Sequence, residues 1–294
     1  MIKDSLSPTE AFRLNARVEN YATRTIEIYD YIFDTLQGFL NGTSVEKVDV
    51  NTLRQYFVHL EDKGLAPATR SLHYRHLKHF YSFLVQEGYT EKNPLDNIRK
   101  PRIPKTLPRV LTNDEIQGLL NACKKTAFTG FRNYVMTLLF LDTGMRLNEL
   151  INLRLDDADI GNRSVRILGK GDKERTVYLG HKTQRELKKY LKWRFSDDSN
   201  NDYVFVSTQE DKLKNRNVQH VYARLSKRAG IKRVAPHQLR HTAATSYIKN
   251  GGDGFTLKEI LGHASIETTN IYITLAGKDV RKAHLKYSPV DRLF

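Results

Sequence analysis

The sequence has a single cysteine, no long apolar run and no hydrophobic leader, and each absence excludes a class of protein. Because Cys123 stands alone, the chain can form no intramolecular disulfide and no cysteine-clustered zinc site. No uninterrupted apolar run approaches the roughly 20 residues that a transmembrane helix needs. The first residues (MIKDSLSPTEAF) lack the apolar core of a signal peptide. The sequence therefore predicts a protein of the reducing cytoplasm.

Proline is scarce, and its placement divides the chain. Four of the eight prolines lie in the segment NPLDNIRKPRIPKTLPR, residues 93–109, where they remove helix donors and favour extended backbone. A chain of 294 residues has room for about two domains. We therefore expect a flexible N-terminal tail, a small helical domain, a basic proline-rich linker and a larger second domain. Their bounds are 1–17, 18–98, 99–110 and 111–294.

Hydrophobic periodicity predicts a mainly helical fold with a small antiparallel sheet. Two β-prone runs, residues 164–168 and 175–179, flank the glycine-rich turn Gly169-Lys170-Gly171-Asp172, which is typical of a hairpin. Thr112 and Glu115 form a predicted capping box. Helices are expected over residues 18–40, 50–63, 67–87, 114–124, 131–142, 147–153, 182–194, 216–229, 239–250, 257–261 and 268–274, with a basic amphipathic stretch over 278–286.

Acidic residues are too few to balance the basic ones, and the imbalance is local. The net charge is +15; residues 1–100 carry 13 Lys/Arg and 13 Asp/Glu, so the remaining 35 Lys/Arg and 20 Asp/Glu supply the whole excess. A strongly basic chain favours a polyanionic partner, although many basic proteins are merely well solvated. Residues 63–86 contain no acidic side chain at all. There Arg70, Arg75 and Lys78 alternate with His73, His76 and His79, which indicates a phosphate-facing helix more than a metal-binding one.

Two short motifs suggest chemistry that their surroundings exclude. His237-Gln-Leu-Arg-His241 has the i, i+4 spacing of a helical zinc pair, but Gln238 stands where a zinc protease needs its glutamate base. Gly169-Lys170-Gly171 lacks both the earlier glycine and the following Ser/Thr of a phosphate-binding P-loop. Neither motif therefore predicts a metal or nucleotide site.

Taken together, four strings in the second domain carry a more specific signal. They are LDTGMRLNEL around Arg146, LGKGDKERTVYLG around Lys170, APHQLRHTAAT around His237 and Arg240, and LKEILGHASIETTNIY around His263 and Tyr272. The set resembles the tyrosine recombinases, the family of integrases and Xer-type resolvases, and the resemblance extends over essentially the whole chain. It implies a DNA clamp made of a helical core-binding domain and an α+β catalytic domain.

Phosphodiester cleavage by a tyrosine requires the same residue types. Two guanidiniums can hold the non-bridging oxygens and stabilise the charge of the transition state, a role we assign to Arg146 and Arg240. A phenol with an ordinary pKa near 10 needs a cationic pocket and a base to attack at neutral pH. Tyr272 is the expected nucleophile, and His237, three residues from Arg240, is the expected base.

The resemblance implies roles for the remaining residues and for the DNA contacts. Lys170 is expected to be the general acid for the departing 5′-oxygen, and His263 to donate a hydrogen bond to the scissile phosphate. His241 is expected to pack against or orient its neighbours. The reaction needs no metal and no other cofactor, because the phosphotyrosyl link retains the bond energy. The residues expected to contact DNA are Arg70, His73, Arg75, Lys78, Arg102 and Lys105.

Other functions and the biological role stay open. A type IB topoisomerase uses similar chemistry to relax DNA, and a DNA-binding protein with a decayed catalytic domain would keep the charge without the activity. The resemblance also implies a tetramer on two duplexes, with the segment after Tyr272 docked into a neighbouring protomer. Integration of a mobile or viral element and the resolution of chromosome or plasmid dimers are both compatible with the sequence.

Overall fold

The chain forms two compact units, Met1–Thr106 and Leu107–Phe294. The computed structural model describes residues 6–104, 106–169, 174–194, 201–263, 265–277, 284–285, 288 and 290–292. Each unit has a hydrophobic core of its own, and the division falls inside the segment predicted as a linker. Among the helices of these residues, none is both long and apolar enough to cross a membrane.

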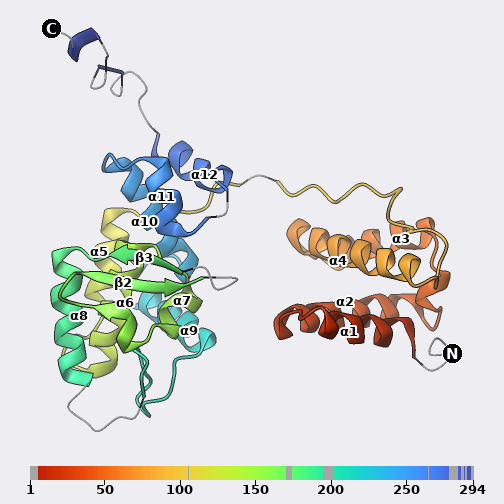
Figure 1. Cartoon of the computed structure of the whole chain (residues 1–294), viewed down its shortest axis with the longest axis horizontal. Helices are drawn as coiled ribbons and strands as arrows, with labels where there is room; N and C mark the ends of the chain where they lie inside the picture. The colour runs from red at the N-terminus through yellow and green to blue at the C-terminus, as the bar shows by residue number, and fades with distance from the viewer. Residues whose placement is uncertain are drawn as a thin grey trace. The chain divides into compact units, whose positions relative to one another are not determined.

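The N-terminal unit packs four helices around a core of aliphatic and aromatic side chains (Figure 1). Ile32, Leu36 and Leu77 are completely buried in it. Proline at the first turn of two of the helices has no N–H to leave unsatisfied and a φ that suits a helix. The elements are α1 (Pro8–Val18), α2 (Thr23–Leu40), the short 3-10 helix η1 (Val45–Lys47), α3 (Val50–Asp62) and α4 (Pro67–Gln86).

The first helix corrects the prediction of a flexible tail over residues 1–17. Ser7 forms a capping box with Glu10, and Pro8 occupies the first turn, so residues 8–18 form helix α1, which the sequence analysis did not predict; the helix expected over 18–40 is α2. Phe12, only 1% exposed, packs against the rings of Phe33 and Phe80. This one large side chain anchors α1 to the core of the unit.

The histidines of α4 correct a second prediction. His73 was expected to face DNA, but it is completely buried and its Nδ1 lies 2.8 Å from the hydroxyl of Tyr56. Burial lowers the pKa of His73 to about 4. His79 lies 3.0 Å from the hydroxyl of Tyr29. The three-residue spacing of these histidines therefore marks a side of α4 that packs against tyrosines of the same unit.

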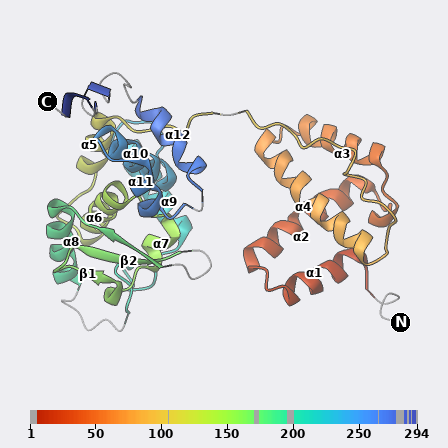
Figure 2. The same ribbon diagram turned by 45° about the horizontal axis from the view of Figure 1, so that its top comes forward.

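The C-terminal unit surrounds a long central helix, α6, whose Val135, Leu139 and Phe140 are completely buried. Helices α8 and α10 both pack on α6, and α10 also contacts α11 and α12 (Figure 2). The elements are α5 (Asn113–Asn121), α6 (Phe128–Thr143), α7 (Leu147–Asn152), η2 (Leu155–Asp157), β1 (Ala158–Asp159), β2 (Ser164–Leu168), β3 (Glu174–Tyr178), α8 (His181–Arg194), α9 (Asn215–Arg228), α10 (Pro236–Lys249), α11 (Gly254–Leu261), α12 (Glu267–Ala276) and η3 (Val290–Arg292).

Strands β2 and β3 pair antiparallel as predicted, with the turn residues 170–173 outside the described residues, and a short strand extends the pair to a three-stranded antiparallel sheet in the order β1-β2-β3. Val165 pairs with Val177 and Ile167 with Arg175. Valine and isoleucine alternate with exposed residues along β2, so one face of the sheet is buried. Strand β3 contacts α11, which brings the hairpin to the end of the unit where α10, α11 and α12 meet. The predicted helix over 278–286 lies largely outside the described residues.

Candidate active site

Arg146 is the N-cap of α7, just after the chain leaves α6 through a glycine. Gly144 has a left-handed φ of 62°, which favours glycine, and a Cβ there would lie 2.8 Å from the end of the Leu261 side chain, which would have to shift. The backbone N–H of Arg146 donates to Glu149 at 2.6 Å, and its Nη1 donates to the same carboxylate at 2.8 Å. These two bonds hold the guanidinium beside the N-terminus of α7.

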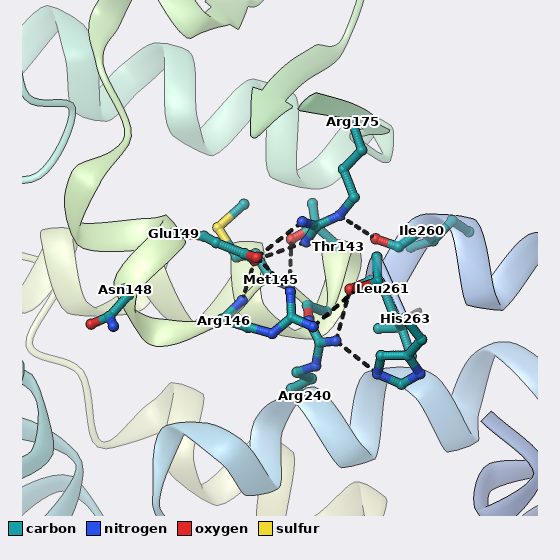
Figure 3. Close-up of polar contacts among 12 residues, drawn as sticks. Thr143, Met145, Arg146, Asn148, Glu149, Arg175, Arg240, Ile260, Leu261 and His263 are labelled. Carbon is teal, nitrogen blue, oxygen red and sulfur yellow. Dashed lines mark hydrogen bonds and ion pairs between the residues drawn. The ribbon is translucent and has the colours of Figure 1, made fainter. Parts of the chain in front are cut away.

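Glu149 is a buried carboxylate shared by two arginines (Figure 3). Arg175 on β3 donates Nη1 and Nη2 to its two oxygens at 2.9 and 2.8 Å, and donates Nε to the Ile260 carbonyl at 2.8 Å. Burial opposes ionisation of Glu149, but the hydrogen bonds from Arg175 and Arg146 outweigh it and lower its pKa to about 2. The carboxylate therefore stays ionised, and it ties α7 to β3 and, through Arg175, to α11.

Arg240, on α10, is held by two backbone carbonyls. Its Nη1 donates to the Gly144 carbonyl at 2.7 Å, and its Nη2 donates to the Leu261 carbonyl at 2.8 Å. Arg240 is 5% exposed, and burial together with the charge of Arg146 lowers its pKa to about 10. The guanidinium is thus still charged at neutral pH, and it links α10 to the ends of α6 and α11.

His263, just after α11, has a partner on each ring nitrogen. Nη2 of Arg240 lies 2.9 Å from Nε2, and Oγ1 of Thr269 lies 3.0 Å from Nδ1. Burial, and then the positive charges of Arg240 and Arg146, lower the pKa of His263 to about 4. The ring is therefore neutral at neutral pH. It stacks on the ring of Tyr272 with 6.2 Å between centroids and 19° between planes.

Tyr272 lies on α12, 3% exposed, in a small apolar cluster with residues of α10 and α11. Its hydroxyl oxygen lies 2.9 Å from Nδ1 of His241. Burial raises the pKa of the phenol, while the charges of Arg240 and Arg146 and a hydrogen bond from Arg240 act in the opposite direction. The hydroxyl is therefore protonated at neutral pH, and His241 holds it in place.

The structure brings four of the six predicted catalytic residues together: Arg146, Arg240, His263 and Tyr272. His237 is exposed at the start of α10, and His241, one turn later, is the histidine that contacts the phenol. Lys170 lies outside the described residues. Each role assigned to these residues stays a prediction.

Sequence reasoning missed three residues that hold this site. Glu149 stands three residues after Arg146 and could have been found as the other half of a capping box. Arg175 is a charged residue on the same face of β3 as the buried Val177, and Glu149 binds its guanidinium there. Thr269 gave no sequence signal, since a threonine in a helix commonly has no polar role.

The predicted DNA-contacting residues have different surroundings in the N-terminal unit. Arg70 forms an ion pair with Glu61 at 2.6 Å, and Lys78 lies 3.4 Å from Asp96. Arg75 and Arg102 are exposed; Lys105 lies outside the described residues. Since His73 is buried, the exposed arginines of this set are the ones most available to phosphate.

Comparison with known proteins is consistent across the chain. Residues 109–278 match the phage integrase family and residues 12–101 match the phage integrase SAM-like domain. A tyrosine recombinase XerC from Staphylococcus carnosus is 30% identical over 286 residues, which cover 95% of this chain and 96% of the relative. A tyrosine recombinase XerD from Halalkalibacterium halodurans is 32% identical over 250 residues, 84% of each chain.

Solved structures of tyrosine recombinases and integrases agree with these sequence matches. The XerH site-specific recombinase, bound to a palindromic difH substrate in a post-cleavage complex, superposes with a TM-score of 0.76 at 25% identity, over 96% of this chain and 85% of that one. The Tn1549 transposon integrase in complex with transposon right end DNA shares the fold, with a TM-score of 0.78 at 18% identity, over 96% of this chain and 100% of that one. The chain therefore belongs to the phage integrase family and is a tyrosine recombinase, a site-specific DNA strand exchange enzyme.

Proposed function

We propose that this recombinase cleaves DNA by attack of the Tyr272 hydroxyl on a backbone phosphorus. The attack forms a 3′-phosphotyrosyl link and releases a 5′-hydroxyl. One phosphodiester replaces another, so the bond energy is retained and no nucleotide is consumed. Attack by a 5′-hydroxyl from a partner duplex then reverses the step and exchanges strands. The observation that carries the proposal is that Tyr272 on α12 meets Arg240 on α10 and Arg146 at the N-cap of α7.

The charge of the site supports this chemistry. Three guanidiniums (Arg146, Arg175 and Arg240) and one carboxylate (Glu149) give 3 − 1 = +2, with Lys170 left outside the count. A phosphodiester carries one negative charge, and an attacking phenolate brings a second. The fixed positive charge therefore equals the negative charge that gathers in the transition state, and a partly buried site strengthens this stabilisation.

The two arginines also keep donors for the substrate. A guanidinium has five N–H donors. Within the described residues Arg240 uses three on Gly144, Leu261 and His263 and donates a fourth to the Tyr272 hydroxyl, which leaves 5 − 4 = 1. Arg146 gives side-chain hydrogens to Glu149 and to the Gly262 carbonyl, which leaves 5 − 2 = 3. These remaining donors are sufficient for bidentate contacts to the non-bridging oxygens of one phosphate.

Proton transfer involves the two histidines of α10 and the lysine of the hairpin. In the free protein His241 holds the phenol hydroxyl, and burial keeps the phenol pKa above its ordinary value. We assign to His237 the acceptance of the phenol proton when a phosphate enters between the arginines. We assign to Lys170 the donation of a proton to the departing 5′-oxygen. Both assignments rest on the sequence resemblance and on the chemistry that the reaction requires.

The partner in this proposal is double-stranded DNA at a specific site. The two units form a clamp on the duplex, with phosphate contacts from the basic C-terminal unit and from exposed arginines such as Arg75. Four protomers on two duplexes exchange strands, in the cytoplasm where the DNA is accessible. The solved neighbours include a XerH–difH complex and complexes of the Tn1549 transposon integrase with DNA. Dimer resolution and transposon integration are therefore both compatible with this fold.

The test uses a duplex selected by binding from a random-sequence pool and then nicked next to the cleavage position. Loss of the short 5′-hydroxyl fragment traps the covalent complex, which a denaturing gel separates from free protein. We expect a denaturant-resistant adduct with the wild type and with Tyr178→Phe, whose tyrosine is 72% exposed on β3, and none with Tyr272→Phe. Adducts from Tyr272→Phe at the wild-type level would refute the proposal. Strand exchange between two selected sites, without relaxation of plasmids that lack them, separates recombination from a topoisomerase activity.

A further inference from the structure

Thr269 is a buried hydroxyl beside the candidate active site, and the proposed reaction assigns it no role. It lies on α12 three residues before Tyr272 and has no exposed surface. Its Oγ1 lies 3.0 Å from Nδ1 of His263, while Nη2 of Arg240 lies 2.9 Å from Nε2 of the same ring. Thr269 and Arg240 thus hold the two nitrogens of His263 from opposite sides.

The chemistry of these two partners decides where the ring proton lies. A guanidinium only donates hydrogen bonds, so Nε2 of His263 must accept from Arg240 through its lone pair. A neutral imidazole has one N–H, which is then on Nδ1 and donates to Thr269 Oγ1. In this arrangement His263 has no hydrogen on Nε2. It cannot donate a hydrogen bond from Nε2 to a phosphate oxygen.

A hydroxyl group can resolve this conflict because it both accepts and donates. We infer that Thr269 is a positioning residue that accepts from Nδ1 of His263 in the free protein and donates to Nδ1 when a DNA phosphate binds the arginines. The inference rests on the proposed function. In the change, one proton leaves Nδ1 and one arrives at Nε2 by exchange with solvent. The ring keeps its single N–H, and the hydroxyl hydrogen of Thr269 rotates to Nδ1.

The energetics favour a change of this kind only when phosphate is present. In the free protein an N–H on Nε2 of His263 would face the Arg240 donor. Two donors would then oppose each other in a half-buried site, which disfavours this tautomer. A phosphate oxygen accepts from both groups at once, so it removes the opposition and stabilises the Nε2–H form. The hydroxyl of Thr269 keeps Nδ1 bonded in either form, which a methyl group in its place could not do.

Two variants separate the hydroxyl from the space that it fills. Thr269→Val keeps the shape and removes the hydroxyl, while Thr269→Ser keeps the hydroxyl. Thr268→Val, at the exposed neighbouring position of the same helix, is the matched control. On the nicked duplex we expect single-turnover adduct formation about 10-fold slower for Thr269→Val, the rate equivalent of one lost hydrogen bond. We expect Thr269→Ser and Thr268→Val to stay within about 2-fold of the wild type, with duplex affinity unchanged in all three.

The tautomer of His263 distinguishes this role from a merely structural one. Long-range proton–nitrogen NMR on protein with labelled histidine measures it. The Tyr272→Phe background allows DNA to bind without cleavage. We expect the Nδ1–H form in the free protein and the Nε2–H form with the duplex bound, and loss of this change in Thr269→Val. Wild-type adduct rates in Thr269→Val, or one tautomer in both states, would overturn the inference. Failure of the proposed function itself gives a different result, which is adduct formation by Tyr272→Phe.

Discussion

Replacing Glu149 by glutamine tests the electrostatic balance of the site through protein stability, independently of catalysis. The Glu149 side chain is 5% exposed and its pKa is lowered from 4.5 to about 2. That interval of roughly 2.5 pH units corresponds to about 3 kcal/mol of unfolding free energy at 1.36 kcal/mol per unit. Because folding lowers this pKa, the stabilisation is complete above pH 4.5 and is lost as the pH falls through about 2. Glu149→Gln should therefore unfold about 3 kcal/mol more easily at pH 7, with about half of that difference left near pH 3.

Urea unfolding followed by tryptophan fluorescence measures this difference. Trp193, on α8, is the only tryptophan of the chain, so its fluorescence reports on the C-terminal unit. Glu259→Gln is the matched control, because the Glu259 side chain is 79% exposed and its ion pair with Lys258 is 3.4 Å long. We expect the control to stay within about 0.5 kcal/mol of the wild type. Equal stability of the two variants at pH 7, or a Glu149→Gln deficit that does not shrink below pH 4, would show that the two arginines do not stabilise an ionised Glu149.

Three further predictions concern DNA, protons and assembly. Arg75→Ala should weaken duplex binding and reduce the slope of log affinity against log salt by about 1. His73→Ala should lower the melting temperature and leave that slope unchanged. Equal slopes for the two variants would contradict the assignment of Arg75 to a phosphate contact. His237→Ala should slow adduct formation by about 100-fold or more, as expected for a general base. His241→Ala should slow it by about 10-fold, because one positioning hydrogen bond is lost. If His241→Ala were the slower variant, the roles of the two histidines would be exchanged. Truncation after Thr274 should spare binding of one duplex and abolish synapsis of two in gel-shift assays, and retained tetramers would refute a docked C-terminal segment.

The elements that the sequence predicted well are those with a local signal. Pro67 begins α4, and the Thr112 capping box begins α5, because both signals act within one helical turn. The hairpin of β2 and β3 followed from β-prone runs around a glycine-rich turn. The tail prediction failed because the capping signal of Ser7 and Glu10 precedes only one large buried side chain, Phe12, with the small Thr9 and Ala16 beside it.

The site was predicted as a set of residues, but its internal contacts were not. Nothing local in the sequence distinguishes His241, which meets Tyr272, from the exposed His237 one turn before it. The bidentate bond between Arg175 and Glu149 joins residues that are 26 positions apart. Whether His73 faces solvent or the core depends on how α4 packs against α3, where Tyr56 lies. Packing between residues far apart in the sequence decides each of these contacts. The hydrophobic periodicity along one helix carries no information about that packing.

In the proposed mechanism the oxygen of Tyr272 becomes covalently bound to the 3′-phosphate of the cleaved strand. Protease digestion of the trapped adduct followed by mass spectrometry identifies the modified peptide directly. We expect one nucleotide-bearing peptide with the added phosphate on Tyr272, in the segment TTNIYITLAGK of α12 and its flank. An adduct on any other residue, or a 5′-phosphate link, would contradict it.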